Sequence, residues 1–179
     1  HRASVLCCTP TYALHLAEIA AREKIDLRQA GVRRIVVAGE PGGSIPGTKM
    51  RIEEAWGAKL IDHTGATEVG AHGFTCAAEC GVHLNEGEFL VEVINPRTGE
   101  PADEGELVLT NLDRLGSPII RYRTGDQVRL NRARCDCGRT FVRVDGGIIG
   151  RIDQMLIVRG VNIFPTALEA IVRSYPEVR

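Results

Sequence analysis

The first sixty residues alternate between short apolar runs and helix-like stretches, and this alternation strongly restricts the fold. The runs at residues 4–8 (SVLCC), 34–38 (RIVVA) and 58–62 (AKLID) have the length and apolar character of buried strands. Residues 9–21 start with a Thr-Pro pair and residues 44–56 contain an early proline, so both intervening stretches are predicted to be helical. Strands and helices at this spacing predict a parallel α/β layer with crossover helices.

Length and composition indicate a globular chain that can bury a core. The chain has 179 residues, 44% of them hydrophobic and 25% charged, with a net charge of −1. No apolar run approaches the ~20 residues of a membrane helix, and the charge balance favours neither nucleic acid nor a membrane as partner. Residues 121–143 are locally basic, either as a solvated face or as part of an anion site. Six cysteines without a signal peptide predict a cytoplasmic protein.

The pattern changes after Gly87, where apolar and polar residues begin to alternate with a period of two. This change predicts a small antiparallel β subdomain attached to the α/β layer. The expected strands lie at residues 88–94, 107–110, 119–122, 127–130 and 140–144.

Two glycine-rich loops follow predicted parallel strands, at residues 39–43 and 64–70. Ligands bind at the carboxyl ends of strands in open α/β sheets, so both loops are candidates for a binding site. Thr67 offers a hydroxyl for a phosphate, and Glu68 a carboxylate for a phosphate-bound Mg²⁺. The alternative is an ordinary turn with a capping threonine.

Cysteines of the middle region suggest a metal site. Cys135 and Cys137 form a CxC pair followed by glycine, and His83 lies upstream together with Cys76 and Cys80. One of the two upstream cysteines with the other three side chains would make a tetrahedral, structural Zn²⁺ site. The alternative is a set of free buried thiols.

Residues 150–165 (GRIDQMLIVRGVNIFP) combine charges and glycines in a turn-rich segment near the end of the chain. Glycine-punctuated polar segments often bring the backbone close to a ligand. Residues 121–126 (RYRTGD) have the same character. A helix is expected at residues 166–175.

Taken together, these segments resemble the AMP-forming, adenylate-forming ligases, most closely the phenylacetate–CoA ligase family. The resemblance rests on six motifs in order and covers nearly the whole chain. They are CTPTYALHLAE (8–18), VAGEPGGS (37–44), DHTGATEVG (62–70), GELVLT (105–110), RYRTGD (121–126) and GRIDQMLIVRGVNIFPTALE (150–169).

The resemblance implies a role for each matched residue. Thr67 and Glu68 would act in catalysis, on phosphate and on Mg²⁺ respectively, and Asp126 would accept both ribose hydroxyls. The other implied nucleotide or coenzyme A contacts are Gly39, Glu40, Pro41, Thr64, Gly65, Arg151, the hinge residue Asp153 and the tunnel residue Gly160. Some relatives hold zinc, and spacing favours Cys76, His83, Cys135 and Cys137 as its ligands over a set with Cys80.

The implied reaction joins a carboxylic acid, expected to be an aryl-acetate or related aromatic acid, to coenzyme A through an acyl-adenylate. Residues 1–152 would be part of the large AMP-binding domain, and residues 153–179 the hinge and start of a small C-terminal α+β domain. The alternatives are transfer to a carrier-protein thiol, or a zinc-stabilised nucleotide-binding or regulatory module without catalysis. The oligomeric state is left open, with a homodimer as one alternative.

Three departures from the family pattern accompany this interpretation. Thr64 stands where relatives often carry tyrosine, and Gln154 replaces a second aspartate after the hinge. The phosphate loop and the adenylation lysine are also missing from the sequence. We therefore expect a fragment that is inactive alone.

Overall fold

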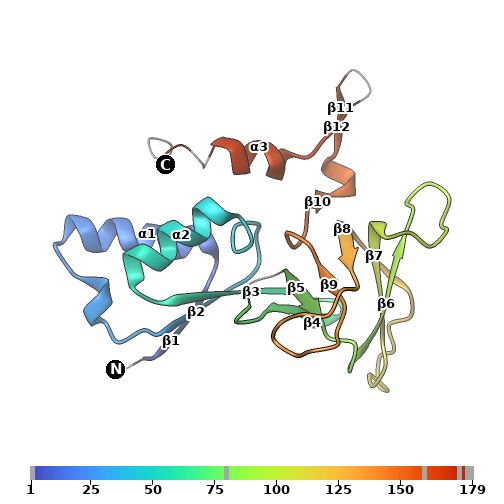
Figure 1. The fold of residues 1–179 in the computed structure, drawn as a ribbon, viewed down its shortest axis with the longest axis horizontal. Coiled ribbons are helices and arrows are strands. Elements are labelled where there is room, and N and C mark those ends of the chain that lie inside the picture. The colour runs from blue at the N-terminus through green and yellow to red at the C-terminus, as the bar shows by residue number, and fades with distance from the viewer. Residues whose placement is uncertain (1–2, 79–80, 159–160, 173–174, 176–179) are drawn as a thin grey trace.

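The computed structural model describes residues 3–78, 81–158, 161–172 and 175, and most of its strands join one mixed sheet (Figure 1). Strand order in this sheet is β1-β2-β3-β4-β5-β9-β8-β7-β6, with β10 paired to β8, while β11 and β12 form a separate two-stranded sheet. The strands are β1 (Val5–Cys8), β2 (Arg34–Val37), β3 (Lys59–Ala66), β4 (Gly70–Thr75), β5 (Val82–Leu84), β6 (Phe89–Ile94), β7 (Glu104–Asn111), β8 (Tyr122–Asn131), β9 (Arg143–Val144), β10 (Gly150–Arg151), β11 (Leu156–Val158) and β12 (Val161–Ile163). The helices are α1 (Pro10–Arg22), α2 (Pro46–Trp56) and α3 (Pro165–Val172), with short 3₁₀ turns at η1 (Leu27–Gln29) and η2 (Ile152–Gln154).

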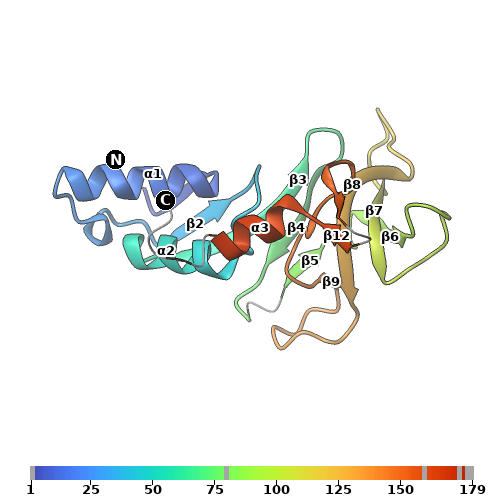
Figure 2. The same cartoon turned by 90° about the horizontal axis from the view of Figure 1, so that it is seen from above.

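The parallel layer is confirmed: β1, β2 and β3 pair in parallel, and α1 and α2 provide the two crossovers. Both helices lie side by side over one face of the sheet (Figures 1 and 2). Thr9 caps α1 by accepting a hydrogen bond from the Tyr12 N–H, and Gly57 ends α2 in the left-handed conformation. The core between helices and sheet consists of Ala13, Ile35, Val37, Ile52, Trp56, Ala58 and Leu60.

The antiparallel part follows from β3 onward and has its own core, which confirms the second half of the predicted fold. Every pairing from β3–β4 to β8–β10 is antiparallel. Its buried side chains are Val69, Val82, Leu84, Phe89, Val93, Leu107, Leu109, Val128, Val142 and Val144.

Two predicted loops are shorter than expected, because strands run through them. The third parallel strand continues to Ala66, where it pairs with β4, so only residues 67–69 remain as a turn. The stretch 119–130 was expected to hold two strands, but residues 122–131 form the single strand β8, and residues 119–121 precede it. Gly125 allows this course with φ of +75°, a backbone conformation that other residues adopt only with strain.

Other strands have no counterpart in the sequence prediction. β4 and β5 were missed, and so was the β11–β12 hairpin inside the segment 150–165. The strand expected at 140–144 is reduced to Arg143–Val144. The C-terminal helix α3 runs from Pro165 to Val172, close to its expected range.

Gly105 on β7 gives a direct test of this packing. A Cβ at this position would collide with the Ile94 carbonyl of the neighbouring strand, whereas a Cβ on Gly116 would meet nothing within 4 Å and needs no unusual φ. Gly105→Ala is therefore expected to lower the free energy of unfolding by about 2 kcal/mol or more, since backbone must move. Gly116→Ala should change it by less than about 0.5 kcal/mol. Urea unfolding of both variants measures the difference, and equal stabilities would contradict the β6–β7 register.

Within the described ranges, no helix is both long and apolar enough to cross a membrane. Helix α3 lies above the junction of the parallel and antiparallel parts, beside β10 (Figures 1 and 2). Its attachment involves Gly150, which leaves no room for a side chain because Phe164 and Thr166 pack against it, and the Thr166 hydroxyl donates to the Ile149 carbonyl. A binding site is therefore expected at the junction beneath α3.

Candidate functional site

A cavity of about 820 Å³ lies at this junction and gathers most of the residues that the motifs indicate. Its volume falls in the range of small-molecule sites. The parallel strands contribute their carboxyl ends, β8 and β10 form the opposite wall, and α3 contributes Thr166, Ala167 and Ala170. The predicted residues on its lining are Gly39, Glu40, Pro41, Thr64, Gly65, Glu68, Asp126 and Arg151.

The loop after β2 forms one edge of the cavity, as predicted from its glycine-rich sequence. Gly39 and Gly42 have φ of +91° and +145°, and a Cβ on Gly42 would lie 2.8 Å from the Pro10 side chain. Glu40 also lines the cavity, but its Oε1 accepts a hydrogen bond from the Thr11 N–H at 2.6 Å. This carboxylate therefore caps the start of α1 and fixes the loop against the helix.

The turn at residues 67–69 presents Thr67 and Glu68 to solvent at the mouth of the site. Both side chains are exposed, and Glu68 lines the cavity, whereas Thr67 lies outside the lining. Burial, followed by the nearby Glu68 charge, raises the pKa of Tyr122, which also lines the cavity. A carboxylate on an exposed turn beside the cavity suits a metal-bound phosphate.

Asp126 and Arg151 face each other across the β8–β10 pair. Their closest side-chain atoms, Oδ1 and Nη1, are 3.5 Å apart, and the same Nη1 donates to the Thr124 carbonyl at 2.9 Å. Burial raises the pKa of Asp126, an effect that Arg151 partly opposes. Asp153 lies outside the cavity lining, where its two oxygens accept from Arg151 at 3.1 and 3.3 Å. Arg151 thus links the cavity to the start of the C-terminal segment.

Sequence reasoning missed a fourth carboxylate on the cavity lining, beside those of Glu40, Glu68 and Asp126. Asp62 ends the parallel stretch of β3 with 9% exposure, accepts a hydrogen bond from the Ser44 hydroxyl, and has its pKa raised by burial. Gly43 packs so closely that a Cβ there would lie 2.5 Å from the Asp62 carboxyl carbon. The signal was available in the sequence, because a polar residue at the carboxyl end of a buried parallel strand usually faces the binding edge. Thr64, on the same strand, has a buried hydroxyl without a hydrogen-bond partner.

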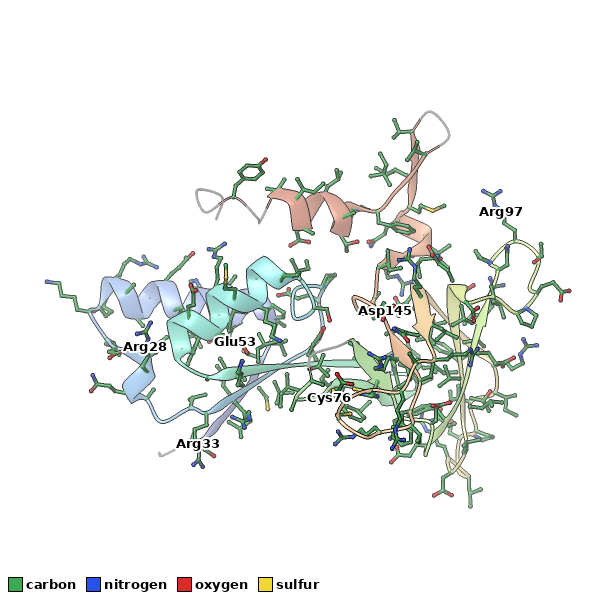
Figure 3. All side chains as sticks on the ribbon, viewed as in Figure 1. Arg28, Arg33, Glu53, Cys76, Arg97 and Asp145 are labelled. Atoms are coloured by element: carbon green, nitrogen blue, oxygen red, sulfur yellow. The ribbon has the colours of Figure 1, made fainter. Side chains whose placement is uncertain are left out.

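A separate cluster brings together the four residues predicted to bind zinc. The ligand atoms of Cys76, His83, Cys135 and Cys137 all lie within 4.8 Å of one another. Cys76 follows β4, His83 belongs to β5, and the two remaining cysteines come from the connection between β8 and β9. Figure 3 shows Cys76 where the parallel and antiparallel parts meet. The alternative ligand Cys80 and the predicted tunnel residue Gly160 both lie outside the described residues.

The geometry and chemistry of this cluster fit Zn²⁺. Tetrahedral bonds of about 2.3 Å to sulfur and 2.1 Å to nitrogen require separations of roughly 3.8 Å for S–S and 3.6 Å for S–N. Here Cys76 Sγ is 3.6 Å from Cys135 Sγ, and Cys137 Sγ is 3.5 Å from His83 Nε2. His83 Nδ1 lies 3.3 Å from the Phe141 carbonyl oxygen, which leaves Nε2 for a metal.

Two further features prepare the Cys135–Cys137 turn for a cation. The Cys137 N–H points at Cys135 Sγ at 3.5 Å, and the Gly138 N–H donates to the Cys135 carbonyl at 2.9 Å with φ of +84° at the glycine. Hydrogen bonding by the Arg139 backbone lowers the pKa of the Cys137 thiol to about 6. A thiolate is the form that binds metal, so this environment favours metal binding at neutral pH.

Known proteins are similar to this chain in sequence and in fold. No protein-family model matches the chain. It is 39% identical to a phenylacetate-coenzyme A ligase of Thermus thermophilus over 99% of the chain and 40% of that protein. A phenylacetate-coenzyme A ligase of Escherichia coli is 37% identical over 92% of the chain and 38% of its own length.

A solved structure agrees with these relatives. The structure of 2-hydroxyisobutyryl-CoA ligase in the postadenylation state, in complex with 2-HIB-AMP, superposes with a TM-score of 0.92 at 35% identity. It is matched over 98% of the chain and 38% of that structure. The chain thus spans about 40% of the length of the curated relatives it matches. Over that span, the chain is similar in sequence to proteins named phenylacetate-coenzyme A ligase and in fold to an adenylate-forming CoA ligase.

Proposed function

We propose that the protein carrying this chain is an AMP-forming acid–thiol ligase that joins a carboxylic acid to coenzyme A. One observation carries the proposal. A single cavity combines the Gly39–Pro41 loop, Glu68 and the Asp126–Arg151 pair in a chain 39% identical to a CoA ligase. In the first half-reaction a carboxylate oxygen attacks the α-phosphorus of ATP and pyrophosphate leaves. In the second, the coenzyme A thiolate attacks the acyl carbon and AMP leaves.

Each residue group in the cavity has a task in this proposal. Asp126 accepts hydrogen bonds from the two ribose hydroxyls, since its two oxygens match a vicinal diol, and Arg151 holds Asp126 in place while adding positive charge near the phosphates. The Gly39–Pro41 loop, Thr64 and Gly65 border the adenine. Thr67 and the backbone of its turn receive phosphate oxygens. Glu68 would hold Mg²⁺, which supplies charge neutralisation for the phosphates when bound.

The chain divides in this proposal into two parts with different roles. Residues 1–152 belong to the nucleotide-binding domain, and Asp153 begins the small domain at a hinge. The separate β11–β12 sheet supports that boundary, across which Arg151 donates to Asp153. Gly160 would approach coenzyme A during the second half-reaction. The Cys76, His83, Cys135 and Cys137 cluster holds a structural Zn²⁺ that ties β4 and β5 to the β8–β9 connection.

Two acid classes are favoured as substrate. Relatives named for phenylacetate support an aryl-acetate, whereas the similarity to a 2-hydroxyisobutyryl-CoA ligase at 35% identity supports a short hydroxy acid. The complete protein should be tested with phenylacetate, benzoate, 2-hydroxyisobutyrate and acetate, with pyrophosphate release as readout. We expect kcat/KM for phenylacetate to exceed the value for acetate by at least about tenfold, because an apolar ring gains burial in the cavity.

Analysis of the acylated products of the same reactions separates the alternatives in acceptor and class. Acyl-adenylate formation followed by acylation of coenzyme A supports the proposal, while acylation of a carrier-protein thiol alone would place the protein among carrier-loading enzymes. ATP binding without pyrophosphate release with any acid would instead indicate a nucleotide-binding or regulatory module. Absence of both binding and turnover would overturn the proposed function.

A further inference from the structure

Side chains from the end of β7 and from the β7–β8 connection hydrogen-bond to the turn at residues 67–69, where the phosphates are proposed to bind. Arg114 Nη1 donates a hydrogen bond to the Glu68 carbonyl, and Asn111 Nδ2 donates to the Val69 carbonyl at 3.1 Å. Tyr122, where β8 begins, lines the same cavity as Glu68. Two consecutive carbonyls of the turn are therefore held by a segment more than forty residues away in the sequence.

Arg114 differs from the other arginines around it. Arg121, Arg129 and Arg132 pair with Glu92, Glu104 and Asp103 at 3.2, 2.8 and 3.6 Å, and Arg123 pairs with Glu106. Among the described residues, Arg114 has no such carboxylate within 4.0 Å, and its guanidinium instead donates to the carbonyl of Glu68. Within the part of the chain that the structure describes, its cation therefore lacks a carboxylate partner, and it lies beside the turn that carries Thr67 and Glu68.

A guanidinium in this position has donors to spare. It carries five N–H groups in a planar fork, of which the Glu68 carbonyl uses one. A phosphate chain bound at Thr67 and the turn backbone would lie within reach of the remaining donors, and its charge exceeds what a single divalent cation at Glu68 can neutralise.

We propose that Arg114 is a phosphate-binding residue that recognises the β- and γ-phosphates of ATP, or free pyrophosphate, and at the same time positions the Glu68 turn. This inference rests on the proposed function, because it assigns a further residue to the same site. It predicts that Arg114 contributes to binding of ATP and pyrophosphate and little to binding of AMP, which lacks the outer phosphates.

Binding measurements on the complete protein test this proposal. Arg114→Gln should weaken Mg·ATP and pyrophosphate binding by about tenfold or more while changing AMP affinity by less than about threefold. Arg114→Lys, which keeps the charge without the fork, should fall between the two. Arg97→Gln serves as the control, since Arg97 points outward at the tip of the β6–β7 connection, far from the cavity (Figure 3).

The outcomes separate the two levels of inference. If the unmodified protein binds none of the three ligands, the proposed function itself fails. If it binds ATP and Arg114→Gln retains that affinity, only the role of Arg114 is refuted. Equal losses for ATP and AMP would also refute phosphate recognition, because they would show that Arg114 merely supports the turn. Circular dichroism of each variant establishes that the fold is intact.

Discussion

Replacing Cys135 by serine is expected to remove the bound metal and to destabilise the protein more than any other cysteine change among those the structure describes. The Cys135 side chain is 3% exposed and lies 3.6 Å from Cys76 Sγ, so its loss leaves three ligands around an enclosed position. Metal bound only by the folded state contributes directly to stability. We expect zinc content to fall from one equivalent to near zero, and the free energy of unfolding to fall by about 3 kcal/mol or more.

A matched control is available within the chain. Cys7 is exposed on the edge strand β1, away from the four-residue cluster, so Cys7→Ser should keep both the metal and the stability. Elemental analysis and thermal unfolding, with and without a chelator, measure both quantities. If the purified protein contains no metal and its melting temperature does not change with chelator, the zinc site is contradicted.

The chemistry of the side chains makes this cluster predictable from the sequence. Cys135 and Cys137 are separated by one residue, so both thiols can bind the same metal ion. Three sulfur ligands and one imidazole suit zinc. The spacing to His83 favoured Cys76 over Cys80 as the fourth ligand. In the structure Cys76 reaches the cluster because β4 pairs antiparallel with β5 and carries Cys76 alongside His83.

The parallel layer was also predictable, because the burial of apolar side chains determines the pattern of its strands. In the run RIVVA, Ile35 and Val37 are fully buried against the helices, whereas Val36 on the opposite face is half-buried. Strands that were missed, such as β4, combine residues typical of a core with residues typical of a loop. β4 combines two glycines with a buried His72 whose ring nitrogens have no hydrogen-bond partner, which resembles a polar loop in the sequence.

The same limit explains why Asp126 was identified through the family resemblance but not placed in a strand. RYRTGD is polar and contains glycine, so local propensity predicts a loop. Long-range contacts decide otherwise: the Thr124 hydroxyl donates to the Leu107 carbonyl at 3.0 Å, and the Gly125 N–H donates to Glu106 Oε1 at 3.2 Å. A strand whose polar residues are satisfied by partners this distant in the sequence cannot be found from a local pattern. Arg114 escaped notice for the same reason.

Asp126→Ala is expected to cause the largest loss of nucleotide affinity of any single change in the cavity. Two charge-assisted hydrogen bonds from the ribose would disappear, and Arg151 would lose one of the two carboxylates that hold it. We expect the affinity for ATP and AMP to fall at least about 30-fold. Calorimetric titration of the complete protein measures this. Asp103→Ala, which removes an exposed carboxylate paired with Arg132, is the control and should leave the affinity unchanged.

The pH dependence of binding provides an independent test of the same carboxylate. Burial raises the pKa of Asp126, so its charged form is lost at a higher pH than the ordinary aspartate value of about 3.9. Ribose binding relies on the carboxylate, and AMP affinity should therefore decline as pH falls through that raised pKa, while the protein remains folded by circular dichroism. Asp126→Asn cannot titrate and should bind weakly with no such step. An identical pH profile in Asp126→Asn would assign the titration to another group, and the buried Asp62 would become the first residue to test.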